Sequence, residues 1–313
     1  MIAFGPVPSR RLGRSLGINN IPPKVCTYAC VYCQLGRTIK MRIERRAFYE
    51  PQEILKAVRD KVERTRYAGE SVDYLTFVSD GEPTLDAHLG LEIELLRPLG
   101  IKIATITNAS LIWREDVRED LMKADWVSLK VDSTREDVWR RVDRPQGTLQ
   151  LALILDGMLE FAKTYRGELA TETMLVEGLN DSDDHVRQVG DFLARLRPAR
   201  AYLAIPTRPP AEEWVRSPSE EAINRAYQIL TQRVNQVEYL IGYEGNAFAL
   251  TGSVEEDLLS ITAVHPMREE AVSEFLGRAG ADWSTVHELI KQAQLVEMAY
   301  EGTKFYMRRP HRR

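Results

Sequence analysis

The sequence predicts an α/β protein with two parts, a partial (β/α)6-type barrel over residues 1–250 and a C-terminal winged helix-turn-helix module over residues 254–313. From about residue 51, amphipathic helical stretches alternate with short apolar stretches that are rich in β-branched residues. This alternation is typical of parallel strands covered by helices. After about residue 250 it stops, and three short helical stretches precede two strand-like ones, which is the outline of a winged helix.

The barrel elements can be placed from the apolar pattern. We expect strands at residues 15–18, 74–78, 102–106, 126–131, 169–176, 201–205 and 237–241. We expect helices at residues 51–66, 86–98, 114–124, 149–165, 182–196 and 218–235. Polar residues or turns follow the strands. Because the loops at the carboxyl ends of barrel strands carry function, we expect these polar groups to share one mouth.

The C-terminal module is expected to contain helices at 254–260, 267–278 and 283–293, then a hairpin that turns at Glu301-Gly302. Ser284 is the expected N-cap of the last helix. Residues 254–313 carry eight Lys+Arg against ten Asp+Glu, and the last helix is nearly neutral. A module that binds nucleic acid usually has a basic recognition helix. The charge therefore favours docking of a protein or peptide, or closure of the barrel, over DNA or RNA binding.

Composition restricts the class of protein. The chain of 313 residues has a net charge of -4, which argues against a protein whose main role is to wrap nucleic acid. No apolar stretch is long enough to span a membrane, and Pro and Arg interrupt the N-terminal residues where a signal peptide would be apolar. We therefore expect a cytoplasmic protein that makes no contact with a membrane.

All three cysteines of the chain lie in the octet CTYACVYC, as Cys26, Cys30 and Cys33. Zinc usually takes four ligands from two separated pairs, and no histidine lies near the octet, so zinc with a distant histidine is the less favoured alternative. Three thiolates from one loop can instead bind three corners of a [4Fe-4S] cluster, which leaves one iron open. Arg10, Arg11 and Arg14 are expected to surround this cluster or an anionic ligand, or else to form salt bridges in the barrel floor.

The CxxxCxxC spacing, with Tyr32 before the last cysteine, resembles the signature of radical S-adenosylmethionine (SAM) enzymes. The resemblance implies that SAM binds the open iron and is cleaved to methionine and a 5'-deoxyadenosyl radical. It also implies an electron donor of the flavodoxin or ferredoxin type. By the same resemblance, Glu82 in the segment 81–85 binds the SAM ammonium, and Asn108 contacts the methionyl carboxylate or ribose. Lys130 and Asp132 match a fourth-strand SAM contact, and Tyr32 is expected at the adenine.

Residues 5–18, together with the octet, resemble iron-sulfur oxidoreductases related to the tRNA wyosine-base synthases. Those synthases carry a second cluster, and this chain has no cysteines left to bind one, so wyosine synthesis itself is not expected. The substrate stays open between an RNA base, as in tRNA, and a peptide or protein side chain. The alternative function is an iron-sulfur regulator that senses redox state and binds DNA through the winged helix, which would leave Glu82 without a role.

Overall fold

The structure is a computed structural model, and it describes residues 1–241, 245–246 and 248–309. Its main sheet has the order β1-β2-β5-β6-β7-β8-β9-β10. The strands are β1 (Ala3–Ser9), β2 (Gly13–Ile18), β5 (Tyr74–Phe77), β6 (Lys102–Thr107), β7 (Trp126–Lys130), β8 (Glu168–Met174), β9 (Arg200–Ala204) and β10 (Val237–Leu240). β1 is antiparallel to β2, and every later neighbour pairs in parallel. The predicted partial α/β barrel is confirmed. Each expected strand begins and ends within two residues of its predicted bounds.

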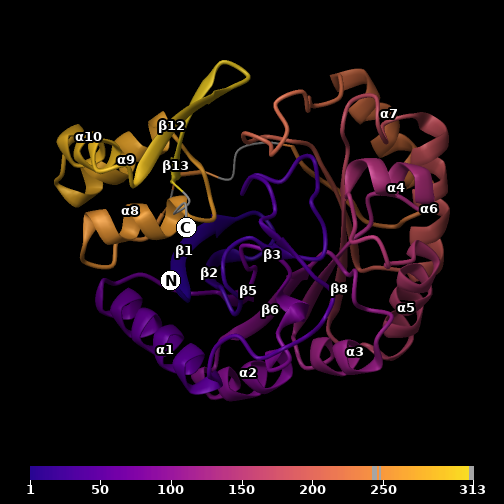
Figure 1. Cartoon of the computed structure of the whole chain (residues 1–313), viewed down its shortest axis with the longest axis horizontal. Helices are drawn as coiled ribbons and strands as arrows, with labels where there is room; N and C mark the ends of the chain where they lie inside the picture. The colour runs from indigo at the N-terminus through magenta and orange to yellow at the C-terminus, as the bar shows by residue number, and fades with distance from the viewer. Residues whose placement is uncertain (242–244, 247, 310–313) are drawn as a thin grey trace.

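Helices cover the outer face of this sheet (Figure 1). They are α1 (Pro51–Tyr67), α2 (Leu89–Leu96), α3 (Glu115–Leu121), α4 (Glu136–Val142), α5 (Leu151–Thr164), α6 (Asp183–Leu196) and α7 (Glu220–Thr231). In α1, Ile54, Val58 and Val62 are buried at a spacing of four, so one stripe of the helix faces the sheet. Ser182 is the N-cap of α6, and its side chain accepts from the backbone N–H of His185.

The hairpin of β1 and β2 fills one end of the barrel interior. At its tip, Leu12 is buried in a cluster with Ala104, Trp126, Ala170 and Tyr202, which belong to β6, β7, β8 and β9. Next to it, the guanidinium of Arg10 donates to the carbonyl of Tyr239 in β10 at 3.5 Å. β1 and β10 are the two ends of the sheet, so this tip bridges the open side of the partial barrel.

After the barrel, the chain forms a small unit with its own apolar core. Its elements are α8 (Val254–Thr262), β11 (Met267–Arg268), α9 (Glu269–Ala279), α10 (Trp283–Lys291), β12 (Leu295–Tyr300) and β13 (Thr303–Arg308), with strand order β11-β13-β12. The expected helices and hairpin are present. The expected cap is wrong, because the side chain of Asp282, not Ser284, accepts from the first turn of α10. The winged helix-turn-helix assignment stays a prediction, and residues 242–244, 247 and 310–313 of the two predicted parts lie outside the described residues.

The C-terminal unit packs beside β1, as Figure 1 shows. Lys61 in α1 forms an ion pair with Asp257 in α8 at 3.0 Å. The side-chain amide of Gln34, one residue after the last cysteine, donates to the carbonyl of Val264 at 3.3 Å. The unit is therefore held against both the outer helix layer and the cysteine loop.

Candidate functional site

The cysteine loop lies over one cavity at the carboxyl ends of the barrel strands. Cys26, Cys30 and Cys33 are free, partly exposed and all line this cavity, which has a volume of about 300 Å³. Its other walls include residues that follow β5 and β6 and residues at the ends of β7, β8 and β10. The expectation that polar groups after the strands share one mouth is confirmed for β5, β6 and β9, whereas Asp132 and Ser133 after β7 do not line this cavity. The volume is at the lower end of the range of small-molecule sites.

The thiols are in a weakly solvated part of this cavity. Burial, with a smaller effect of the Glu82 charge, raises the pKa of Cys26 to about 12, and burial also raises the pKa values of Cys30 and Cys33. Bound metal therefore has to displace the thiol protons. In the described part of the chain, no three His, Cys, Asp or Glu side chains form a group for a single metal ion. Three sulfurs from one loop are a donor set that fits a cluster with three protein ligands.

Gly81 lets the loop after β5 approach the cysteine loop closely. Its φ is +150°, and a Cβ atom at this position would lie 1.8 Å from the carbonyl oxygen of Val25. The same carbonyl accepts from the backbone N–H of Glu82 at 3.2 Å. The backbone beside Cys26 is thus packed directly against the segment that carries Glu82, and only glycine fits at the contact.

Glu82 is buried and surrounded by donors. Its Oε1 accepts from the backbone N–H of Thr84 (3.0 Å) and from the hydroxyls of Thr84 (2.5 Å) and Thr107 (2.6 Å). Its Oε2 accepts from the backbone N–H of Asn108 at 2.8 Å. Burial raises the pKa of Glu82, and these donors oppose the rise. Glu82 also caps the short 3-10 helix Pro83–Leu85, so the capping role and a cavity-facing carboxylate are compatible in one residue.

Asn108 links the loop after β6 to the cysteine loop. Its side-chain amide donates to the Thr27 hydroxyl at 2.8 Å and approaches the Cys26 Sγ at 3.6 Å. Its Oδ1 accepts from the backbone N–H of Ser110 at 3.0 Å, which is the turn-forming role that an asparagine also has elsewhere. Asn108 therefore orients the first cysteine as well as lining the cavity.

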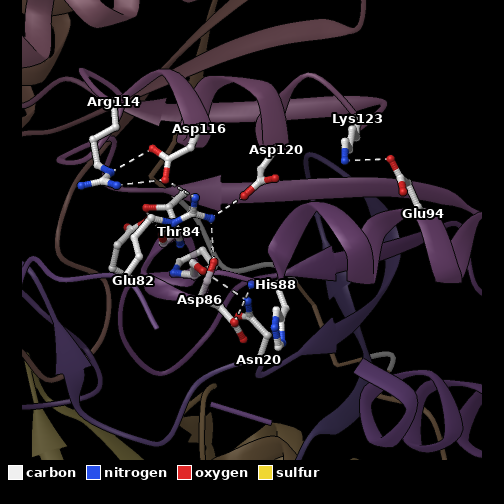
Figure 2. A network of polar contacts seen from close by, with 12 residues as sticks. Asn20, Glu82, Thr84, Asp86, His88, Glu94, Arg114, Asp116, Asp120 and Lys123 are labelled. Atoms are coloured by element: carbon white, nitrogen blue, oxygen red, sulfur yellow. Dashed lines mark hydrogen bonds and ion pairs between the residues drawn. The ribbon is translucent and has the colours of Figure 1, made fainter. Parts of the chain in front are cut away.

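The guanidinium of Arg45 holds the segment after Glu82 in place, a contact that the sequence did not indicate. It donates to the carbonyl oxygens of Thr84 (2.9 Å) and Asp86 (2.7 Å) and pairs with Asp116 (2.9 Å) and Asp120 in α3. Figure 2 shows these four partners gathered around this contact. Because the Arg45 side chain is only 7% exposed, these partners replace the water that would otherwise solvate its guanidinium.

A partly buried charge cluster lines the cavity beside the predicted SAM contact at Lys130. The Lys130 ammonium pairs with Glu172, and Arg11 pairs with the same carboxylate at 2.5 Å. Burial alone would raise the pKa of Glu172, but the two cations outweigh it and lower the pKa to about 2. Glu172 was not predicted from the sequence, although a glutamate inside the strand expected at residues 169–176 was a usable signal. In the structure it is the pairing partner of Lys130 across β7 and β8. Arg14, by contrast, pairs with Glu70 at an exposed position and does not line the cavity.

Asp132 is the one predicted site residue that does not line this cavity among the described residues. It is buried beside it, where the Tyr32 hydroxyl donates to Asp132 and lies 3.2 Å from a carboxylate oxygen of Asp143. Burial and the neighbouring Asp132 charge raise the pKa of Asp143. The Cys30 thiol donates to Asp143 at 3.4 Å, so Asp143, which was also not predicted from the sequence, holds two residues of the cysteine loop at the end of α4.

Comparisons with known proteins agree with this fold. The profile described as Radical SAM superfamily matches residues 20–189. The UPF0026 protein MJ1312 of Methanocaldococcus jannaschii is 47% identical over 309 residues, which cover 98% of this chain and 96% of that protein. Two solved structures share the fold. A radical SAM methyltransferase from Sphaerobacter thermophilus has a TM-score of 0.55 and 18% identity, and the match covers 72% of this chain and 66% of that one. TYW1 with a lysine-pyruvate adduct bound has a TM-score of 0.54 and 17% identity, and the match covers 71% of this chain and 74% of that one. None of the described helices has the length and apolar character needed to cross a membrane.

Proposed function

Because this chain belongs to the radical SAM superfamily, we propose that it is an enzyme that binds a [4Fe-4S] cluster through Cys26, Cys30 and Cys33 and cleaves SAM reductively. When bound, the cluster supplies one electron to SAM, which gives methionine and a 5'-deoxyadenosyl radical that acts on a further substrate. The protein holds the reacting groups in a fixed geometry and keeps water away from the radical.

The observation that carries this proposal is the joint position of three free thiols and a buried carboxylate in one cavity. Cys26, Cys30, Cys33 and Glu82 come from two loops that Gly81 brings into direct backbone contact. Three thiols supply three ligands, so a four-iron cluster bound here keeps an iron for a ligand that is not protein. The Glu82 carboxylate would face the SAM ammonium, an arrangement that a charge-assisted hydrogen bond favours.

The remaining predicted residues have roles that fit their contacts. Asn108 steadies Cys26 and lies at the cavity, where a SAM carboxylate or ribose would meet its amide. Lys130 is held by Glu172 and its ammonium lies 5.2 Å from the ring centre of Tyr32. Tyr32 presents its ring to the cavity for the adenine, while Asp132 acts behind it by accepting from its hydroxyl.

Two substrate classes stay open, as proposed from the sequence. One is an RNA base, such as one in tRNA, and the other is a side chain of a peptide or protein. The C-terminal unit, proposed as a winged-helix module, would dock a peptide substrate or close the barrel. A flavodoxin- or ferredoxin-type protein would supply the electron. The comparisons give no support to the alternative of a DNA-binding regulator.

The proposal is tested by anaerobic reconstitution with iron and sulfide, followed by dithionite and SAM. We expect 5'-deoxyadenosine and methionine in equal amounts from wild-type protein, and neither above background from Cys30→Ala. If both proteins give the same yield, the cluster assignment is wrong. A wild-type preparation that binds four irons but never cleaves SAM would refute the enzymatic function.

A further inference from the structure

We propose that residues 37–42, here called the basic strand segment, form the docking surface for an acidic protein that delivers single electrons to the cluster. This inference rests on the proposed function, because reductive cleavage of SAM needs an electron from outside the chain. The segment contains β4 (Lys40–Met41) and directly follows the cysteine loop.

The basic strand segment presents apolar side chains to solvent. Ile39 is 75% exposed and Met41 is 39% exposed, with Lys40 between them also exposed. Single exposed apolar residues are common on protein surfaces, whereas neighbouring ones beside a functional site mark contact surfaces. The hydroxyl of Thr38 donates to the Tyr28 carbonyl at 2.7 Å, which anchors the segment to the cysteine loop. The surface is therefore held in place before any partner binds.

The charge of this region is opposite to that of the chain. Residues 36–46 contain five Lys+Arg and one Asp+Glu, a net charge of +4, while the whole chain carries -4. Arg37 has a side chain that is 76% exposed and pairs with Glu212 at 3.2 Å, and Arg45 is used inside the protein by its contacts with α3. Lys40 forms no ion pair within the residues that the structure describes, and it stays available to a carboxylate of a partner.

The backbone joins this surface to the cluster ligands. β4 pairs in parallel with β3 (Val25–Cys26), where Met41 is the partner of Cys26, and the N–H of Arg42 donates to the Cys26 carbonyl at 3.1 Å. Neighbouring strands lie about 4.8 Å apart, so a protein seated on β4 is one strand away from a cluster ligand. Electron tunnelling weakens steeply with distance, so an electron donor has to bind close to the cluster. A donor bound on β4 would be close to it.

The occupant that fits is an acidic electron-carrier protein. The encounter makes and breaks no covalent bond: the reduced carrier loses one electron and the oxidised cluster gains it. Complementary charge speeds such encounters and makes them sensitive to salt, and electron-transfer contacts are small. RNA also binds basic surfaces, but the exposed Ile39 and Met41 and the nearness of Cys26 favour a redox protein.

The test compares two reductants on the same reconstituted protein, dithionite and enzymatically reduced flavodoxin, an acidic one-electron carrier. The variants are Lys40→Glu and Ile39→Ser, and neither residue lines the cavity. The matched controls are Lys56→Glu on α1 and Leu153→Ser on α5, which are exposed positions away from the cysteine loop. We expect Lys40→Glu and Ile39→Ser to lower flavodoxin-driven SAM cleavage about tenfold, with dithionite-driven cleavage unchanged. Added salt should lower the flavodoxin-driven rate of wild-type protein.

Several results would overturn the docking surface. One is equal flavodoxin-driven rates in the two variants and the two controls. A second is a wild-type protein that dithionite drives and flavodoxin does not. A third is loss of dithionite-driven cleavage in both variants, which would place the segment in cluster assembly. A fourth is weaker tRNA binding by Lys40→Glu at an unchanged flavodoxin-driven rate, which would make the segment an RNA contact. Failure of dithionite with wild-type protein refutes the proposed function instead.

Discussion

Replacing Gly81 with alanine is expected to separate the cysteine loop from the loop that carries Glu82. The new Cβ would lie 1.8 Å from the Val25 carbonyl oxygen, where real contacts stay above 3.0 Å, so main chain has to move by more than 1 Å. Backbone strain at a positive φ costs about 1–3 kcal/mol. The movement also breaks the hydrogen bonds from Glu82 N to Val25 O and from Lys24 N to Asp80 O, each contributing about 1 kcal/mol.

The sum predicts that Gly81→Ala lowers the free energy of unfolding by about 3–5 kcal/mol. For a chain of this size that corresponds to a drop in Tm of roughly 6–10 °C. Gly100→Ala is the matched control, because Gly100 has a φ of +69° and a Cβ there meets nothing within 4 Å. Its cost should be only about 1–2 kcal/mol.

The assay is Tm by circular dichroism together with iron bound per chain after anaerobic reconstitution. We expect Gly81→Ala to bind less iron than wild-type protein and Gly100→Ala to bind the same amount. If Gly81→Ala is no less stable than Gly100→Ala and binds full iron, the close backbone contact does not organise the site.

Three further predictions follow from buried charges. Arg45→Met should raise the KM for SAM roughly tenfold at unchanged iron content, because two carbonyls of the Glu82 loop lose a charged donor. An unchanged KM would mean that Arg45 does not position this loop for SAM. Glu92→Gln should be more stable than wild-type protein at high pH. Burial raises the pKa of Glu92 to about 9, so wild-type stability falls as pH rises from ~4.3 toward 9. An equal fall of Tm in the variant would show that Glu92 does not cause this pH dependence. Glu172→Gln should cost about 3 kcal/mol at neutral pH, since the partly buried cations of Arg11 and Lys130 lose their shared partner. As the pKa of Glu172 is about 2, this difference should shrink as pH falls below ~4.3, and a constant Tm gap would contradict it.

The barrel was predictable because its helices and strands carry strong local patterns. β1 was missed, since Pro6 and Pro8 weaken a strand signal, although an edge position such as β1 tolerates proline. α4 is short and lies between two clear elements, so its pattern was too brief to separate from a loop. The N-cap of α10 was misplaced by two residues because Asp282 and Ser284 are both good capping residues.

The site was predictable where its residues follow strands and not where they act through distant partners. The cysteines, Glu82 and Asn108 lie in loops that one rule of barrel architecture brings together. Arg45 and Asp143 depend on which loops fold against the cavity, and a single sequence does not contain that information. Asp132 was expected among the cavity residues, but its side chain lies behind Tyr32, a difference that depends on side-chain orientation at the end of β7.

The proposed function requires that the bound cluster has one iron that no side chain ligates and that SAM binds there. Electron paramagnetic resonance of the dithionite-reduced protein, with electron-nuclear double resonance and SAM labelled with oxygen-17 in its carboxylate, tests this directly. We predict that SAM changes the spectrum of the reduced cluster and that the labelled oxygen couples to it. A spectrum that SAM leaves unchanged, with no coupling, would mean that SAM does not bind the cluster.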